Sequence, residues 1–232
     1  AEEFRRRGRS VGTVKSIYCP TFTMDDPKSK TFRHRRAGAE LICGVVPGTD
    51  KKTLEEAARK GAQVEKHLRR VPVAEGEAYF IPPGCVHAVG KGILLYEIQP
   101  ASDVTYRFYD WNRVDAQGEK RPLQLEKALE AAALSLRPGP ISRGAEAGVQ
   151  PLVQGDAFVL DRLTVQRELP IAPDPRRFAL LTALSTLLLS WEGDGLELKK
   201  GDTVLLPARR PHLTLQGAGE ALLAQPALPE EE

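Results

Sequence analysis

The stretch GEAYFIPPGCVH at residues 76–87 returns in altered form as GDTVLLPARRPH at residues 201–212. Each copy begins with Gly and an acidic residue, continues through apolar residues to a Pro, and ends with a His eleven residues after the Gly. A Gly-acid pair is typical of a hairpin turn, and Pro cannot continue a central strand. The repeat therefore predicts two copies of one β unit, each with a His at the start of the strand that follows the Pro.

The segments around the repeat also indicate a mainly β protein. Short apolar runs are separated by Gly and Pro, and several alternate apolar and polar residues at the period of a half-buried strand. In the first half, strands are expected at 39–46, 77–82, 86–90, 93–99 and 104–109. In the second half, the runs FVLDRLTVQREL, FALLTALSTLLLSW, TVLLP, LTLQ and EALLAQP predict further strands.

Two segments are predicted to be helical. Thr53 and Glu56 have the spacing of a capping box, which predicts a helix from Thr53 to about Arg70 with an interruption at Gly61. The run LQLEKALEAAAL at 123–134 consists mostly of strong helix formers.

Composition argues against several classes of partner. The formal net charge of the 232 residues is +2, which gives no overall attraction to nucleic acid or to a membrane surface. No apolar run reaches membrane-spanning length, and the basic residues 1–36 lack the apolar core of a signal peptide. Cys19, Cys43 and Cys85 lack metal-type spacing and favour a reducing compartment. We therefore expect a cytoplasmic protein, whose oligomeric state the sequence does not indicate.

Four residues of the first copy match a known motif. Gly76, Pro82, Gly84 and His87 have the spacing of the second cupin motif, and in this respect the chain resembles the cupins, which are small β-barrels with an internal metal or ligand site. The resemblance implies a mainly β fold of two cupin-type, jelly-roll barrels joined by a connecting helix. The expected divisions are an atypical or incomplete segment at 1–38, a first barrel with helices at 39–136, and a second barrel at 149–232.

The sequence around and after His87 carries a more specific resemblance. Residues 81–115 resemble the signature block of the short, bacterial-type mannose-6-phosphate isomerases, which reads P-x-G-T-x-H-A-I-G and then E-x-Q-Q-x-S-D-x-T-Y-R-x-Y-D. Cys85 and Pro100 replace the usual Thr and Gln of that block. The resemblance extends over roughly residues 38–225. It implies a metal-dependent enzyme that interconverts mannose 6-phosphate and fructose 6-phosphate, with a catalytic first barrel and a non-catalytic second one.

The same resemblance implies one zinc ion, with His87 as a ligand. The family's other ligands lie in upstream Q-V-H-P and K-T-E-x-W-Y segments, neither of which occurs in this sequence. The nearest match to the second segment is GTVKSIYC at 12–19, which has Lys15 at the position of the Glu. We therefore expect that the chain lacks the family's amino-terminal segment and that residues 13–36 replace a missing strand, a difference that truncation, frameshift or divergence would each produce.

Three further side chains are candidates for the isomerisation, which needs an acid/base and a positive group for the enediolate charge. Arg107 is the catalytic cation that the resemblance implies, and otherwise a solvated strand-face residue. Glu97, in the apolar run ILLYEIQ, is a candidate acid/base or an outward-facing residue paired with a Lys. Lys91 is a substrate-binding candidate or a turn residue, and His87 without metal would be a hydrogen-bonded core histidine.

The absence of the upstream ligands favours a second hypothesis. In that hypothesis the chain is a catalytically silent cupin that binds a sugar phosphate. A third possibility, an unrelated two-barrel oxygenase or decarboxylase, requires two or three His in one site, and the chain contains only four His in total.

Overall fold

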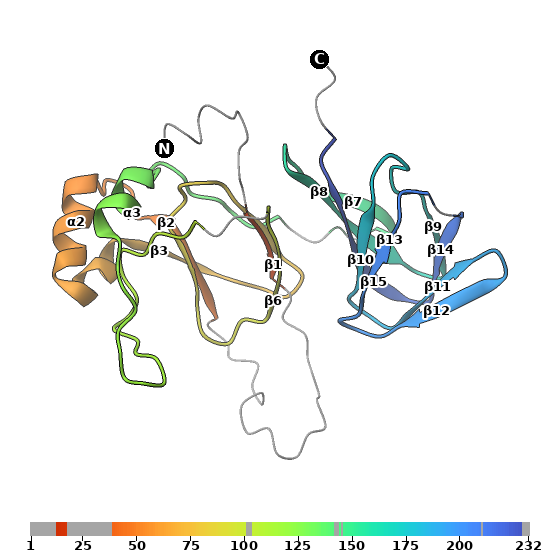
Figure 1. Cartoon of the computed structure of the whole chain (residues 1–232), viewed down its shortest axis with the longest axis horizontal. Coiled ribbons are helices and arrows are strands. Elements are labelled where there is room, and N and C mark those ends of the chain that lie inside the picture. Colours follow the sequence, from red (N-terminus) through yellow and green to blue (C-terminus); the bar gives the residue numbers. More distant parts are fainter. Residues whose placement is uncertain are drawn as a thin grey trace. The chain divides into compact units, whose positions relative to one another are not determined.

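The computed structural model describes residues 13–17, 39–100, 104–141, 144, 146–209 and 211–228. The chain divides into two compact units, Ala1–Ser142 and Arg143–Glu232, and each unit has its own sheets and its own apolar core (Figure 1). No helix in these described ranges is long and apolar enough to cross a membrane.

In the described part of the first unit there are two three-stranded antiparallel sheets, with the strand orders β3-β2-β5 and β4-β1-β6. The bounds are β1 Thr13–Ile17, β2 Glu40–Val45, β3 Leu68–Pro72, β4 Ala78–Ile81, β5 His87–Val89 and β6 Leu95–Ile98. Side chains from both sheets form one core, which includes Leu41 and Cys43 of β2 together with Tyr79 and Ile81 of β4. The inner faces of the two sheets are therefore the faces that carry these four residues.

The described residues of the first unit form three helical segments. They are α2 at Lys51–Arg59, the 3-10 helix η1 at Gly61–His67, and α3 at Leu125–Ala131. Helices α2 and α3 lie side by side (Figure 1), and an ion pair of 3.2 Å joins Arg59 Nη2 of α2 to Glu126 Oε1 of α3. Helix α3 confirms the helix predicted at 123–134, although it covers only the central part of that run.

The start of α2 differs from the predicted capping box. Asp50 is the N-cap residue, and its Oδ1 accepts a hydrogen bond of 2.7 Å from the Thr53 backbone N–H. Asp is a stronger N-cap than Thr, and an acidic cap also suits the positive end of the helix dipole. The helix ends at Arg59 rather than near Arg70, because Gly61 leaves the α-helical region and the chain passes through η1 into β3. The prediction of a helix capped by Thr53 was therefore wrong.

The segment 104–110 has no regular secondary structure, so the strand predicted at 104–109 was wrong. Adjacent side chains of a strand point to opposite faces, yet Phe108 and Tyr109 both pack against the apolar cluster around α2 and α3. The backbone of Arg107 bonds to Gln124 rather than to a neighbouring strand. The other four strands predicted in the first half are confirmed.

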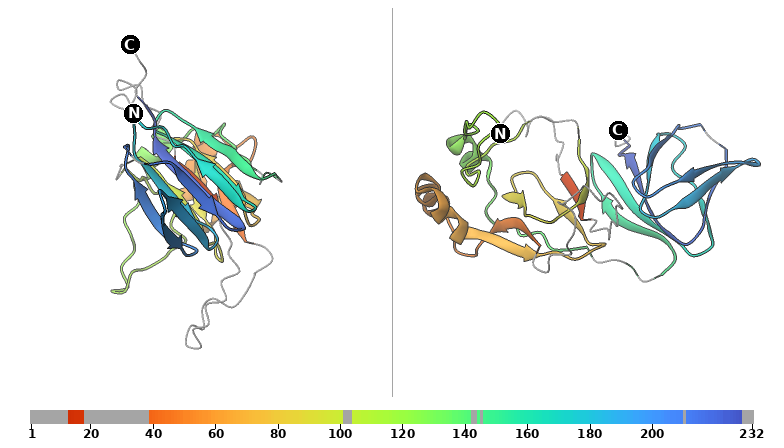
Figure 2. Two further views of the ribbon diagram at one scale, coloured as in Figure 1. Left: turned by 90° about the vertical axis from the view of Figure 1, so that its right-hand side faces the viewer. Right: turned by 90° about the horizontal axis from the view of Figure 1, so that it is seen from below.

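The second unit is a sandwich of two antiparallel sheets, ordered β13-β10-β15-β8-β7 and β12-β11-β14-β9. The bounds are β7 Gly148–Gln154, β8 Phe158–Val165, β9 Glu168–Ile171, β10 Ala179–Ala183, β11 Leu187–Trp191, β12 Asp194–Leu198, β13 Thr203–Leu206, β14 Leu213–Gln216 and β15 Gly219–Pro226. The two sheets lie face to face (Figure 2), and the core between them includes Leu163 and Leu181 from the larger sheet and Leu189 and Leu215 from the smaller. The predicted strands of the second half are confirmed.

The sequence repeat has the same local structure in both units. Glu77 Oε2 accepts a hydrogen bond of 2.9 Å from the Ala74 N–H, and Asp202 Oδ2 accepts one of 2.8 Å from the Lys199 N–H. The acid after each repeat Gly therefore closes the turn that leads into β4 or β13. Both strands end immediately before the repeat Pro. The predicted mainly β, cupin-type fold is confirmed, although the described sheets are open and do not close into barrels.

Candidate functional site

His87 is the first residue of β5 and follows the turn Pro82-Pro83-Gly84. The Cys85 N–H donates a hydrogen bond of 3.1 Å to the Pro82 carbonyl, which closes this turn. The Nδ1 atom of His87 lies 2.9 Å from the Cys85 carbonyl oxygen. Because a carbonyl oxygen only accepts, Nδ1 donates in this contact, and in the neutral form of the ring the lone pair is then on Nε2. Metal-ligating histidines are held by the same kind of bond.

The register of β5 against β2 places His87 on the inner face of its sheet. His87 pairs with Cys43 and Val89 pairs with Leu41, and residues directly opposite one another share a face of the sheet. Cys43 and Leu41 are completely buried in the core. His87 itself is exposed, so it lies where the inner face reaches solvent.

The second sheet places Glu97 on its own inner face. Tyr79 of β4 and Glu97 of β6 both stand opposite Lys15 of β1, and therefore lie on one face of this sheet. Tyr79 belongs to the core between the sheets, so this face is the inner one. Glu97 is exposed, as His87 is. The two candidates thus come from opposite sheets but from faces that are both directed toward the interior of the first unit.

Lys91 lies in the turn that connects β5 to β6, and its side chain is exposed. This turn carries the chain from one sheet of the first unit to the other. Lys91 therefore belongs to neither strand and does not share the inner-face positions of His87 and Glu97.

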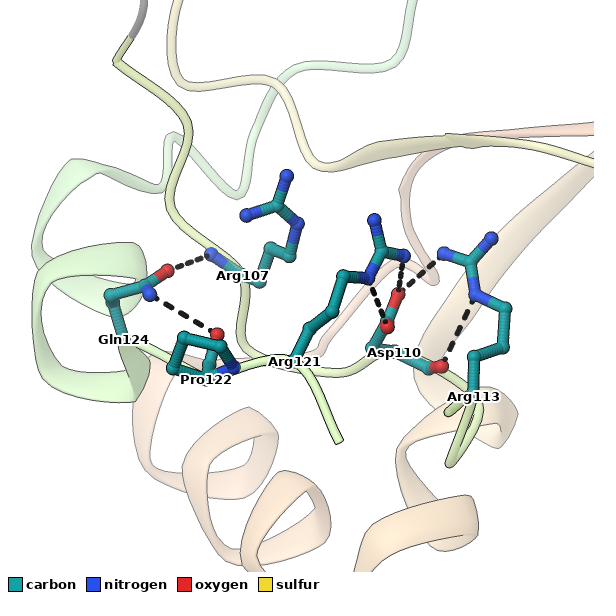
Figure 3. Close-up of polar contacts among 6 residues, drawn as sticks. All are labelled: Arg107, Asp110, Arg113, Arg121, Pro122 and Gln124. Carbon is teal, nitrogen blue, oxygen red and sulfur yellow. Dashed lines mark hydrogen bonds and ion pairs between the residues drawn. The ribbon is translucent and has the colours of Figure 1, made fainter. Parts of the chain in front are cut away.

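Arg107 is held by its backbone, while no described residue engages its guanidinium. The Arg107 N–H donates to Gln124 Oε1 at 3.0 Å, and the Gln124 N–H donates to the Arg107 carbonyl at 2.7 Å. Figure 3 shows the guanidinium extending away from these bonds. Within the described part of the chain, the Arg107 guanidinium makes no hydrogen bond or ion pair. A fixed backbone with an unpaired planar cation is suited to binding an anionic oxygen.

Asp110 is the centre of a charge cluster beside Arg107 (Figure 3). Its side chain is buried and accepts hydrogen bonds from Arg121, at 2.8 Å from Nε to Oδ2 and 2.5 Å from Nη2 to Oδ1. Arg113 also donates to Oδ1. The paired arginines, Arg121 first, hold the pKa of Asp110 below its ordinary value against the opposing effect of its burial.

The turn between Asp110 and Arg113 has an unusual backbone. Trp111 and Asn112 both have left-handed φ angles, 51° and 52°, which bulky residues such as Trp rarely adopt. The Arg113 N–H bonds the Asp110 carbonyl at 3.0 Å, and the Arg113 guanidinium lies 5.9 Å from the Trp111 ring centroid. The ion pairs of Asp110 and this ring contact hold the chain in a conformation that the local sequence does not favour.

Replacing Asp110 with Asn should destabilise the protein by about 2 kcal/mol at neutral pH, because charge-assisted hydrogen bonds of a buried carboxylate are lost. The folded-state pKa of Asp110 is lowered, so its contribution is complete above the ordinary Asp pKa of about 4 and disappears as the pH falls through the folded-state value. Urea unfolding of the wild type and the variant between pH 7 and pH 2 measures this difference.

The control for this prediction is Glu126→Gln, which removes the ion pair between Glu126 and Arg59. The Glu126 side chain is 78% exposed. We expect its effect to stay within about 0.5 kcal/mol. A stability loss in Asp110→Asn that stayed constant from pH 7 to pH 2 would contradict the assignment of a charged, paired Asp110.

Sequence reasoning missed Asp110, Arg113, Arg121 and Gln124. The signature block contains Asp110, but nothing in its spacing indicates that this Asp is buried or that Arg121 reaches back to it. The contacts depend on the turn 111–112 and on the placement of α3, neither of which a periodic pattern reveals.

A zinc site needs about three protein ligands and one open position. Among the described residues, no group of three or more His, Cys, Asp or Glu side chains could hold a metal ion. In neutral His87 the Nδ1 contact leaves the lone pair on Nε2, an atom type that binds zinc, but one imidazole is insufficient. The described residues therefore do not form a complete zinc site and offer His87 as a single candidate ligand.

Comparison with known proteins identifies relatives of the chain. The candidate mannose-6-phosphate isomerase YvyI of Bacillus subtilis is 35% identical over 154 residues, which cover 65% of this chain and 49% of YvyI. GmuF of the same organism, also a candidate mannose-6-phosphate isomerase, is 30% identical over 196 residues, covering 81% of this chain and 60% of GmuF. The chain thus spans about half to three fifths of the length of these curated relatives. No family model matches the chain.

Solved structures share the fold. The crystal structure of the mannose 6-phosphate isomerase from Bacillus subtilis has a TM-score of 0.76 and 29% identity, and the match covers 96% of this chain and 67% of that protein. A zinc-bound mannose 6-phosphate isomerase has the same fold with a TM-score of 0.64, at 13% identity, and the match covers 94% of this chain and 66% of that protein. By sequence and by fold, the chain is similar to the bacterial-type mannose-6-phosphate isomerases.

Proposed function

We propose that the chain interconverts mannose 6-phosphate and fructose 6-phosphate. The observation that carries this proposal is the segment 81–113. In it, His87 and Glu97 lie on the inner faces of two sheets, and Arg107 is held by its backbone with a guanidinium that no described residue engages. A proton acceptor and a permanent cation are the groups that an isomerisation through an enediolate requires. The similarity to these isomerases supports the same reaction and the same sugar phosphate.

In the proposed reaction, Glu97 acts as the acid/base. Its carboxylate takes the proton from C2 of mannose 6-phosphate, and the electron pair of the C–H bond forms the double bond of an enediolate. Glu97 then returns the proton to C1, while the proton of the O2 hydroxyl moves to O1. Arg107 stabilises the negative charge on the enediolate oxygens, and Lys91 is the candidate for contact with the phosphate. The product is fructose 6-phosphate, and no atom is gained or lost.

Zinc, when bound, would polarise the two substrate oxygens. We assign His87 as one ligand, and a complete site would need ligands from outside the described ranges. We further propose that the first unit carries catalysis, that the second unit does not, and that the protein acts in the reducing cytoplasm. His212, the counterpart of His87 in the repeat, precedes β14, and none of the described residues around it forms a metal-type cluster.

One observation favours the alternative function, a sugar-phosphate-binding protein without turnover. The described residues contain no group of three or more metal-ligand side chains, and the catalytic constellation is correspondingly incomplete. In this case the chain would bind mannose 6-phosphate or fructose 6-phosphate and release it unchanged.

The decisive experiment combines metal analysis of the purified chain with an assay that couples fructose 6-phosphate formation to a dehydrogenase. Isomerase function predicts turnover of mannose 6-phosphate and about one equivalent of divalent metal. His87→Gln should remove most of the metal and lower kcat/KM by at least about 10²-fold, the effect of losing a positioned electrostatic group. His212→Gln, at the matching position of the second unit, should change neither value.

The two functions give different results in this experiment. Calorimetric binding of the sugar phosphate without turnover, together with less than a tenth of an equivalent of metal, would reject the isomerase and favour the silent binder. Equal effects of His87→Gln and His212→Gln would contradict the assignment of the site to the first unit.

A further inference from the structure

The contact between Arg107 and Gln124 has an unusual distribution of hydrogen bonds. Two backbone groups of Arg107, its N–H and its C=O, both bond to Gln124. The two bonds form a closed ring. The side-chain oxygen of Gln124 accepts from the Arg107 N–H, and the backbone N–H of Gln124 donates to the Arg107 carbonyl. Because two bonds fix a peptide segment in position and in orientation, they determine where the Cα of Arg107 lies and the direction in which its side chain leaves the backbone.

Gln124 is also the N-cap residue of α3, and this position makes its side chain notable. An N-cap side chain ordinarily accepts a hydrogen bond from an N–H of the first helical turn, and Asn, Asp, Ser and Thr do this well. Gln124 makes no such bond, and its Oε1 accepts from Arg107 instead, while its Nε2 donates to the Pro122 carbonyl at 3.1 Å. The side chain is thus diverted from the helix to the segment 104–110. A departure from a local rule of this kind is expected where function requires it.

The anchor is tied into the fold by hydrogen bonds and buried side chains. The Ala128 N–H bonds the Gln124 carbonyl at 2.8 Å to begin the helix, and Ala128 and Leu129 of α3 are buried. Three residues before Gln124, Arg121 binds the buried Asp110. The segment 107–110 is therefore fastened to the segment 121–124 at both ends, as Figure 3 shows.

We infer that Gln124 is a positioning residue for Arg107 and that its side-chain oxygen sets the place of the Arg107 guanidinium. This inference rests on the proposed isomerase function, because Arg107 is the proposed catalytic cation. Gln124 itself does not contact the reacting atoms and acts only through the Arg107 backbone. A displacement of a catalytic group by about 1 Å can cost up to 10²-fold in rate.

Two substitutions at Gln124 distinguish the effect of the side-chain oxygen from the effect of side-chain size. Gln124→Leu keeps the size and removes the acceptor. Gln124→Glu keeps an acceptor oxygen for the Arg107 N–H, but it adds a negative charge and replaces the donor to the Pro122 carbonyl with an acceptor oxygen. We expect Gln124→Leu to lower kcat/KM for mannose 6-phosphate about tenfold, and Gln124→Glu to retain more than half of it. Gln117→Leu, an exposed position in the loop before α3, is the matched control and should leave the activity unchanged.

Amide hydrogen exchange at Arg107 supplies a measurement that does not depend on turnover. The Arg107 N–H should be protected in the wild type, in Gln124→Glu and in Gln117→Leu, and should exchange at least about ten times faster in Gln124→Leu. Circular dichroism of each variant verifies that the fold persists.

The outcomes distinguish the two proposals. Unchanged Arg107 exchange in a folded Gln124→Leu, or equal loss of activity in Gln124→Glu and Gln124→Leu, would overturn the positioning role. An inactive wild type would overturn the isomerase function. If the wild type were inactive but the Arg107 amide lost protection in Gln124→Leu alone among the variants, the anchoring of Arg107 by Gln124 would still be supported.

Discussion

Arg107→Met is expected to lower kcat/KM for mannose 6-phosphate by about 10³-fold, the upper range for removing one preorganised electrostatic group. The proposed enediolate carries its negative charge on oxygen, and a guanidinium placed beside that oxygen stabilises the transition state more than the neutral substrate. Met retains most of the side-chain length but none of the charge. Arg107→Lys should recover only part of the rate, because an ammonium cannot form the planar, two-point contact of a guanidinium.

The structure makes this substitution a clean test. Among the described residues, Arg107 is anchored by backbone bonds to Gln124, which survive a change of side chain, and its guanidinium has no partner there to lose. The unfolding midpoint of Arg107→Met should therefore remain close to the wild-type value. Arg209→Met is the control, because Arg209 is an exposed residue of the second repeat. An Arg107→Met variant with more than a tenth of wild-type kcat/KM would remove Arg107 from the mechanism.

The periodicity of apolar residues and the positions of Gly and Pro between the apolar runs were sufficient to predict most of the strands. The repeat predicted a Gly-acid turn, a strand, a terminating Pro and a His at the start of the next strand. Both copies follow this order, except that His212 lies directly before β14 rather than within it. These features depend only on residues close in sequence. The inner-face positions of His87 and Glu97 then follow from strand register, which alternation alone leaves undetermined until the partner strands are known.

The segment 104–110 shows why the rest could not be predicted. VTYRFYD alternates as a strand would, but the backbone N–H and C=O of Arg107 bond to Gln124, seventeen residues away, and are not available to a sheet. In the sequence Asp110 is indistinguishable from an exposed polar residue. In the structure it is buried and forms an ion pair with Arg121. Both results depend on where α3 packs, and this is tertiary information. The Thr53 cap failed for a local reason, because Asp50 competes for the same helix end.

Gly84→Ala is expected to destabilise the first unit by about 3 kcal/mol. Gly84 has a φ of +78°, a left-handed conformation that costs a non-Gly residue about 1–2 kcal/mol. A Cβ on Gly84 would in addition lie 2.6 Å from the Ala131 carbonyl oxygen, which is backbone and cannot rotate away. Forcing the turn and the end of α3 apart adds a further 1–3 kcal/mol, roughly. The Ala133 N–H to Gly84 carbonyl bond of 2.9 Å would be strained by the same displacement.

Gly118→Ala separates the two causes of this loss. Gly118 has a similar φ of +85°, but no atom of the described residues lies within 4 Å of the position that its Cβ would occupy, so only the conformational cost of about 1–2 kcal/mol applies. Urea unfolding measures the loss of stability in both variants, and the additional loss in Gly84→Ala is the part caused by the contact with Ala131. Because Gly84 ends the turn that directs His87, Gly84→Ala should also lower the metal content and kcat/KM, whereas Gly118→Ala should leave both unchanged. Equal destabilisation by the two substitutions would show that the close approach of α3 does not constrain the turn before His87.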